Sequence, residues 1–125
     1  MLRITDMDAA LRFYCNVLGC SEERRVDELG LVQLRAGSAL IDLVPVDSPL
    51  GRRGGEAPGR NHRNLDHFCL RVEPFDGDAV RSTLAAAGFE PSEITRVYGA
   101  EGYGLSVYVN DPDGNTVELK GPAEG

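Results

Sequence analysis

A histidine and a glutamate, His67 and Glu118, are the residues whose types could do chemistry together. An imidazole and a carboxylate form a common ligand pair for a divalent metal ion that keeps open coordination positions. Both residues fall in predicted strands, about Leu65 to Val72 and Asn115 to Lys120, on the polar side of the alternation. Two residues alone are a weak signal, because a lone strand histidine is more often structural and a lone strand glutamate more often solvated.

Alternation of apolar and polar residues gives each predicted strand one apolar and one polar face. The apolar faces can pack on helices, so a curved sheet could enclose a pocket with the polar residues on its concave side. The residues expected on that side are His67, Arg71, Asp42, Tyr108 and Glu118. The same pattern also fits polar residues that face bulk water on a half-exposed antiparallel sheet.

The elements that must position these residues occur twice along the chain. A first βαβββ unit has a strand at Leu2 to Ile4, a helix from about Met7 to Leu18, and strands at about Glu23 to Asp27, Leu31 to Arg35 and Ala39 to Val46. A second has the strand from Leu65, a helix at Asp78 to Ala87, and strands at about Glu90 to Tyr98, Leu105 to Asn110 and Asn115 to Lys120. The helix-ending glycines, Gly19 and Gly88, lie 69 residues apart, and the opening strands align at an offset of 68.

The repeat supplies a third candidate ligand. Aligning Ile41-Asp42-Leu43 on Val117-Glu118-Leu119 places Asp42 at the position of Glu118 in the first unit. The position that matches His67 falls two residues before Met1. In the second unit, the turn at residues 111–115 predicts a three-residue hairpin loop that sets Tyr108 directly opposite Glu118.

Length and composition limit the function. A chain of 125 residues with 42% hydrophobic and 26% charged residues predicts one globular domain, with modules at 1–46 and 65–122 and a linker at 47–64. A net charge of −7 argues against nucleic-acid and membrane partners. The three cysteines, with no signal peptide or apolar span, favour buried free thiols in a cytoplasmic protein. His62 in the arginine-rich linker is either an alternative ligand or a surface residue, and the linker either covers the pocket or is solvated.

Three stretches resemble one family, the vicinal oxygen chelate proteins of the glyoxalase, bleomycin-resistance and dioxygenase superfamily. The opening resembles theirs at Leu2-Arg3-Ile4-Thr5-Asp6-Met7-Asp8-Ala9-Ala10-Leu11-Arg12-Phe13-Tyr14 and Val17-Leu18-Gly19. Signatures of the second module are similar to Leu65-Asp66-His67-Phe68 and Asp111-Pro112-Asp113-Gly114-Asn115-Thr116-Val117-Glu118-Leu119. The resemblance implies an α+β fold, in which two βαβββ modules form a cupped, barrel-like mixed sheet with helices on the convex side.

The resemblance also implies a site. His67 and Glu118 match metal ligands of the second module, and Asp42 stands where glyoxalase I-like members have a glutamate. Glu118 would also move a proton, Tyr108 resembles the tyrosine beside the metal in fosfomycin-modifying members, and Arg71, Tyr108 and Ser106 would bind substrate.

These residues predict a metal-dependent, glyoxalase-like enzyme of the lyase or isomerase type that acts on a small substrate with two adjacent oxygens. The expected cofactor is a divalent metal ion (Zn, Ni, Mn or Fe), with glutathione as a candidate co-substrate, and the expected assembly is a homodimer. The alternatives are a metal-free small-molecule binding protein of the bleomycin-resistance type and a fosfomycin-type thiol transferase.

Overall fold

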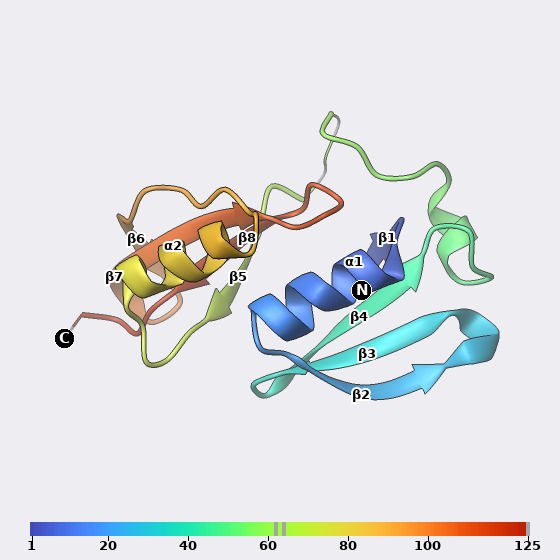
Figure 1. Ribbon diagram of the computed structural model, residues 1–125, viewed down its shortest axis with the longest axis horizontal. Helices are drawn as coiled ribbons and strands as arrows, with labels where there is room; N and C mark the ends of the chain where they lie inside the picture. Colours follow the sequence, from blue (N-terminus) through green and yellow to red (C-terminus); the bar gives the residue numbers. More distant parts are fainter. Residues whose placement is uncertain (62, 64, 125) are drawn as a thin grey trace. The chain divides into compact units, whose positions relative to one another are not determined.

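The computed structural model describes residues 1–61, 63 and 65–124, which divide into two compact units (Figure 1). One unit is Met1–His62 with Pro112–Gly114, and the other is Arg63–Asp111 with Asn115–Gly125. The described residues form two four-stranded mixed sheets with few helices, which confirms the α+β class; the sheets are not closed into a barrel. No helix in the described ranges is long and apolar enough to cross a membrane.

The first unit follows the predicted βαβββ order. Its elements are β1 (Leu2–Ile4), α1 (Met7–Leu11) continued by a π-helical stretch (Arg12–Val17), β2 (Ser21–Val26), a 3-10 turn (Asp27–Leu29), β3 (Leu31–Ala36) and β4 (Ala39–Pro45). Asp6 caps α1 by accepting from the Ala9 N–H at 3.0 Å, and Gly19 ends the helical segment at φ 86°, a conformation that favours glycine. The sheet order is β1-β4-β3-β2, with β1 parallel to β4.

The second unit repeats this order. Its elements are β5 (Phe68–Arg71), α2 (Gly77–Ala86), β6 (Thr95–Gly99), β7 (Gly102–Asn110) and β8 (Thr116–Lys120). The sheet order is β5-β8-β7-β6, with β5 parallel to β8, so each strand occupies the place of its counterpart in the first sheet. Asp76 caps α2 by accepting from the Asp78 and Ala79 N–H groups at 3.1 Å.

Strand pairing confirms the repeat at single-residue register. Leu2 lies opposite Leu43 in the first sheet, and Leu70 lies opposite Leu119 in the second. Each unit buries the apolar side of its strands, with Ile4, Phe13, Tyr14, Leu34 and Leu43 in the first core and Leu84, Val107, Val109, Val117 and Leu119 in the second.

Two predicted strands of the second unit begin later than expected. The strand predicted from Leu65 begins at Phe68, so His67 lies directly before β5. The strand predicted from Glu90 begins at Thr95, because Ser92 changes the pairing with β7: its backbone N–H donates to the Tyr108 carbonyl, but its hydroxyl takes the Tyr108 N–H, both at 2.8 Å. A side chain that accepts this N–H replaces a backbone carbonyl in the ladder.

The predicted linker at 47–64 contains a 3-10 turn, Gly51–Gly54, that is bound to β1. The Arg3 guanidinium donates to the carbonyl oxygens of Gly51, at 2.8 Å, and of Gly54 and Glu56, both at 3.1 Å. A Cβ on Gly54 would lie 2.3 Å from Arg3 Nε, so any other residue there would displace the guanidinium from these carbonyls. His62 lies outside the described residues.

Candidate metal centre

His67 and Glu118 meet because β5 and β8 are parallel neighbours. Cys69 on β5 lies opposite Glu118 on β8, and His67 precedes Cys69 by two residues, which returns its side chain to the same face. His67 Nε2 is 3.3 Å from Glu118 Oε2. The imidazole is 36% exposed and the carboxylate 8%, so the pair joins a buried acid to a ring that solvent can reach.

Each of these side chains is held by a second group. Asp66 Oδ2 lies 2.7 Å from His67 Nδ1, and the Ser106 hydroxyl donates to Glu118 Oε1 at 2.6 Å. A carboxylate on one imidazole nitrogen is the usual arrangement when the other nitrogen binds a metal, because it fixes the tautomer and the ring orientation. The two remaining heteroatoms, Nε2 and Oε2, therefore face each other.

Tyr108 completes the polar face around this pair. It lies opposite Glu118 across β7 and β8, as the sequence predicts, and its ring packs edge-on against the His67 ring at 5.4 Å between centroids. Burial and the negative charge of Glu118 raise the pKa of the Tyr108 phenol. The phenol therefore keeps its proton at neutral pH and can donate it in a hydrogen bond.

The carboxylates around His67 also act on the ring. The hydrogen bond that the imidazole donates to the Asp66 carboxylate raises the pKa of His67, partial burial lowers it, and the charge of Glu118 raises it again, with a net shift upward. Asp66 itself has a lowered pKa for the same reason, its hydrogen bond to His67. Protons and a metal ion would thus compete for the ring nitrogen.

The cysteines differ in part from expectation. All three thiols are free, but none is buried: Cys15 and Cys20 are half-buried, and Cys69 is exposed. Cys69 stands on the polar face of β5 beside Glu118, where partial burial and the carboxylate charge raise its pKa to about 11. A thiol with so high a pKa is a poor nucleophile at neutral pH.

Asp42 belongs to the first unit, and Arg71 is engaged in ion pairs. Asp42 is on β4 of the first unit, half-buried, where Oδ1 accepts from Gln33 Nε2 at 3.0 Å. Arg71 is on β5 with its guanidinium in ion pairs with Glu101, at 2.8 Å, and with Glu73. Among the described residues, no group of three or more His, Cys, Asp or Glu side chains is arranged to hold a metal. His67 and Glu118 offer one imidazole nitrogen and one carboxylate oxygen, donor types that suit a divalent ion.

Sequence reasoning missed the role of Asp66. Adjacent residues of a regular strand point to opposite faces, which argues against contact between Asp66 and His67. Because β5 begins only at Phe68, the irregular backbone before it lets the Asp66 carboxylate reach the ring of its neighbour. The one sequence feature that could have indicated this contact is the acidic residue directly before the histidine.

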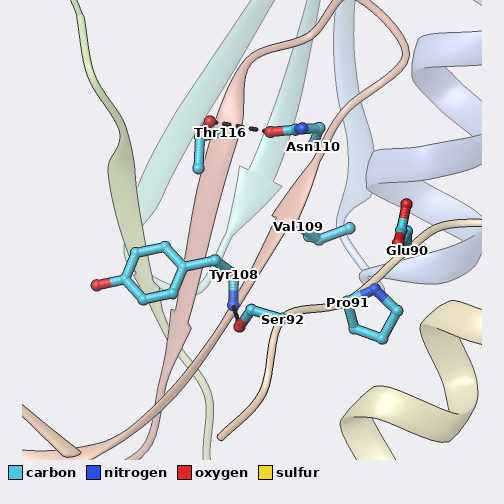
Figure 2. Close-up of a pocket in the computed structure, with 7 residues that line it drawn as sticks. All are labelled: Glu90, Pro91, Ser92, Tyr108, Val109, Asn110 and Thr116. Atoms are coloured by element: carbon cyan, nitrogen blue, oxygen red, sulfur yellow. Dashed lines mark hydrogen bonds between the residues drawn. The ribbon is translucent and has the colours of Figure 1, made fainter. Parts of the chain in front are cut away.

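A pocket of about 280 Å³ also lies in the second unit, beside β7 (Figure 2). Its lining residues are Glu90, Pro91, Ser92, Tyr108, Val109, Asn110 and Thr116. The Tyr108 ring extends away from Glu90 and Pro91 in this view, and Thr116 donates to Asn110 at 2.9 Å. The ring that contacts His67 is thus directed away from the pocket wall formed by residues 90 and 91.

The protein belongs to the class of proteins built from two βαβββ modules. Comparison with known proteins identifies the family. Residues 1–119 match the pattern of the Glyoxalase/Bleomycin resistance protein/Dioxygenase superfamily. The chain belongs to this superfamily.

Three similar proteins show the range of names within it. The chain is 26% identical over 118 residues to a catechol-2,3-dioxygenase of Bacillus subtilis; the match covers 94% of this chain but 38% of that protein. It is 28% identical to a probable lactoylglutathione lyase of Synechocystis, with 95% and 89% covered. The solved structure of the fosfomycin resistance protein FosX from Listeria monocytogenes has a TM-score of 0.70 at 18% identity, with 98% and 88% covered, and shares the fold.

Proposed function

We propose that this chain is a metal-dependent, glyoxalase-like enzyme that binds a small substrate through two adjacent oxygens, with His67 and Glu118 as metal ligands. The observation that carries the proposal is the 3.3 Å approach of His67 Nε2 to Glu118 Oε2 while Asp66 and Ser106 hold the opposite heteroatoms. A lone structural histidine needs neither the second carboxylate nor the orienting one. Similarity to a probable lactoylglutathione lyase supports this reaction type.

Asp42, on β4 of the first unit, is the other carboxylate proposed as a metal ligand. Its carboxylate is oriented by Gln33 much as the Glu118 carboxylate is oriented by Ser106. The donor types, one imidazole nitrogen and carboxylate oxygens, suit Zn, Ni, Mn or Fe and leave room for substrate oxygens. The metal, when bound, would act as a Lewis acid on the two substrate oxygens.

The other residues of the polar face have separate proposed roles. Glu118 accepts the proton that leaves the substrate, and Tyr108, protonated at neutral pH, donates a hydrogen bond to a substrate oxygen that gains negative charge. Ser106, expected from the sequence to bind substrate, is fully buried and donates to Glu118, so we assign its hydroxyl to positioning that carboxylate. Arg71 can bind an anionic group of the substrate only if Glu73 or Glu101 releases the guanidinium.

Metal content tests the site before any substrate is known. The purified protein is expected to bind one equivalent of Zn, Ni, Mn or Fe, measured by elemental analysis and titration calorimetry, and His67→Ala is expected to lose it. His62→Ala is the matched control, since His62 is the other histidine of the sequence. Stoichiometric metal that persists in His67→Ala would rule out the proposed centre.

Activity tests the reaction class. The metal-loaded protein is expected to turn over the adduct of a 2-oxoaldehyde with glutathione, and Glu118→Gln is expected to lose this activity. A catechol and fosfomycin with a thiol serve as comparison substrates, because relatives carry those names. If fosfomycin with a thiol is the one substrate of the three that is turned over, the chain is assigned to thiol transfer.

A metal-free binding protein is the second candidate. The observation that favours it is that the described residues contain no group of three ligating side chains. It predicts a wild-type protein that binds no divalent metal with useful affinity and yet is stabilised against thermal unfolding by a small polar molecule.

A further inference from the structure

Lys120 is a buried cation on the polar face of the second sheet, and the proposed function does not use it. It is the one lysine of the sequence, against twelve arginines, and it is 7% exposed. Glu118 and Lys120 are two residues apart on β8, so their side chains stand on the same face. A charged side chain is seldom buried unless a group of opposite charge accompanies it.

Two glycines make room for the Lys120 side chain. Lys120 lies opposite Ser106 on β7, and its ammonium group donates to the Val97 carbonyl on β6 at 2.7 Å. A Cβ on Gly99 would lie 2.9 Å from Lys120 Cε, and a Cβ on Gly104 would lie 3.2 Å from Nζ. An ammonium group has three N–H donors, and the bond to Val97 uses one of them. The other donors can bind a further acceptor.

The carboxylate on the same face is directed at other groups. Glu118 Oε1 accepts from the Ser106 hydroxyl, and Oε2 faces the His67 imidazole. In the part of the chain that the structure describes, Lys120 forms no ion pair with an aspartate or a glutamate. Its charge still acts on this face: burial and Glu118 raise the pKa of the Cys69 thiol to about 11, and Lys120 opposes them.

Arg71 is the other cation on this face of the described strands, and carboxylates already neutralise it. It lies opposite Lys120 in the parallel pairing of β5 with β8, and its guanidinium binds Glu73 and Glu101. An anion that binds Arg71 must displace one of these carboxylates, whereas an anion that binds Lys120 displaces none. It would also supply the opposite charge that a buried ammonium group requires. Lys120 is therefore the better anion site of the two.

We propose that Lys120 binds an anionic group of the substrate, a carboxylate or a phosphonate, and so determines the charge of the substrate that this site selects. The proposal rests on the proposed function, because the same substrate places its two adjacent oxygens at the metal. Residues two apart on a strand are separated by about 7 Å, so a substrate that reaches both points carries its anionic group several ångströms from those oxygens. Hydrogen bonds between ionised partners are stronger than neutral ones, which favours the anion over a neutral analogue.

Three catechols that differ in one substituent test this selection. All have two adjacent oxygens; 3,4-dihydroxybenzoate adds a carboxylate, 3,4-dihydroxyphenylphosphonate a phosphonate, and 3,4-dihydroxybenzamide a neutral group of similar shape. Zinc-loaded wild type is expected to bind at least one of the two anions about tenfold or more tightly than the amide, measured by titration calorimetry. The anion with the larger preference identifies the group that the site takes.

Substitutions assign this preference to one residue. Lys120→Gln is expected to lose the preference for the anion, and Lys120→Arg is expected to keep part of it. Arg96→Gln is the matched control and should keep all of it, because Arg96 lies opposite Leu105, on the other face of the same sheet. Circular dichroism establishes that each variant is folded.

The single lysine also gives a readout in the wild-type protein. Chain labelled with carbon-13 at lysine Cε has one lysine side-chain signal in its nuclear magnetic resonance spectrum. This signal is expected to shift further when an anion binds than when the amide binds. A lysine that only connects β8 to β6 would not distinguish the charge of the ligand.

Two results overturn the proposal: folded wild type that binds neither anion more tightly than the amide, and a preference that survives in Lys120→Gln. Metal content is measured separately, and the titrations are repeated without zinc. A preference that depends on Lys120 in a chain that binds no metal would support the anion site and refute the metal centre. Bound zinc with no preference for an anion would support the metal centre and refute the anion site.

Discussion

The two sheets of this protein place a carboxylate at the same point and use it differently. Asp42 and Glu118 occupy matching positions on β4 and β8, beside leucines that pair with leucines of β1 and β5. Asp42 lies opposite Gln33, which donates to it, and Glu118 lies opposite Tyr108, whose ring contacts His67. The comparison shows that the two units share the same strand pairing, residue by residue, which we call the frame. The chemistry at each carboxylate depends on the side chains around it.

The largest expected effect concerns the shared frame. Leu43→Ala and Leu119→Ala remove equivalent, buried side chains, and each should lower the free energy of unfolding by about 2–5 kcal/mol, because both leave a cavity in a core. Urea denaturation of both variants checks this. A loss at one position and no loss at the other would contradict the equivalence of the two frames.

The next prediction separates the two carboxylates. Glu118→Gln should weaken metal binding by more than about a hundredfold, since loss of a ligand exceeds the usual effect of losing a group behind one. Asp42→Asn should have a smaller effect, because Asp42 contacts Gln33 whereas Glu118 faces the His67 imidazole. Titration calorimetry with Zn and Mn measures both. An equal loss of metal affinity in the two variants would show that Asp42 contributes as much to metal binding as Glu118 does.

Much of the frame was predictable from sequence, because it follows from local rules. Aspartate and glycine at the ends of a helical pattern predicted the first helix, which Asp6 caps and Gly19 ends. The hairpin at residues 111–115 fixed the register of β7 and β8, and with it the pairing of Tyr108 with Glu118. Strand alternation then placed His67 on the face of Glu118.

What sequence could not show depends on contacts that alternation does not encode. Alternation placed Arg71 on the polar face, but its pairs with Glu73 and Glu101 depend on where two loops run. The Ser106 hydroxyl reaches Glu118 diagonally across the β7–β8 pair. Sequence reasoning considered the residue directly opposite Glu118, so it did not find this contact. The bulge at residues 22–24 likewise changes the faces of β2 without a glycine or proline to mark it.

Partial burial and, second to it, the charge of Glu118 on the neighbouring strand raise the pKa of the Cys69 thiol. Its pKa of about 11, against 9.0 for an unperturbed thiol, leaves about a hundredfold less thiolate at pH 8. Alkylation of Cys69 by iodoacetamide should be correspondingly slow and should rise with pH up to about 11. Glu118→Gln removes a charge that disfavours the thiolate, so it should lower the pKa and speed the reaction. Peptide mapping by mass spectrometry resolves Cys69 from Cys15 and Cys20. Fast alkylation of Cys69 at neutral pH would contradict its raised pKa.

The smallest effects distinguish the two groups that orient the carboxylates. Ser106→Ala should weaken metal binding about 10- to 100-fold, because Glu118 Oε1 loses the donor that holds Oε2 toward His67. Gln33→Ala removes the matching donor of Asp42 and should lower the free energy of unfolding by about 0.5–1.5 kcal/mol. Its metal affinity should change less than that of Ser106→Ala if the centre is built mainly on the second unit. Equal weakening by both variants would show that both units supply oriented ligands, and Asp42 would then bind the metal together with Glu118.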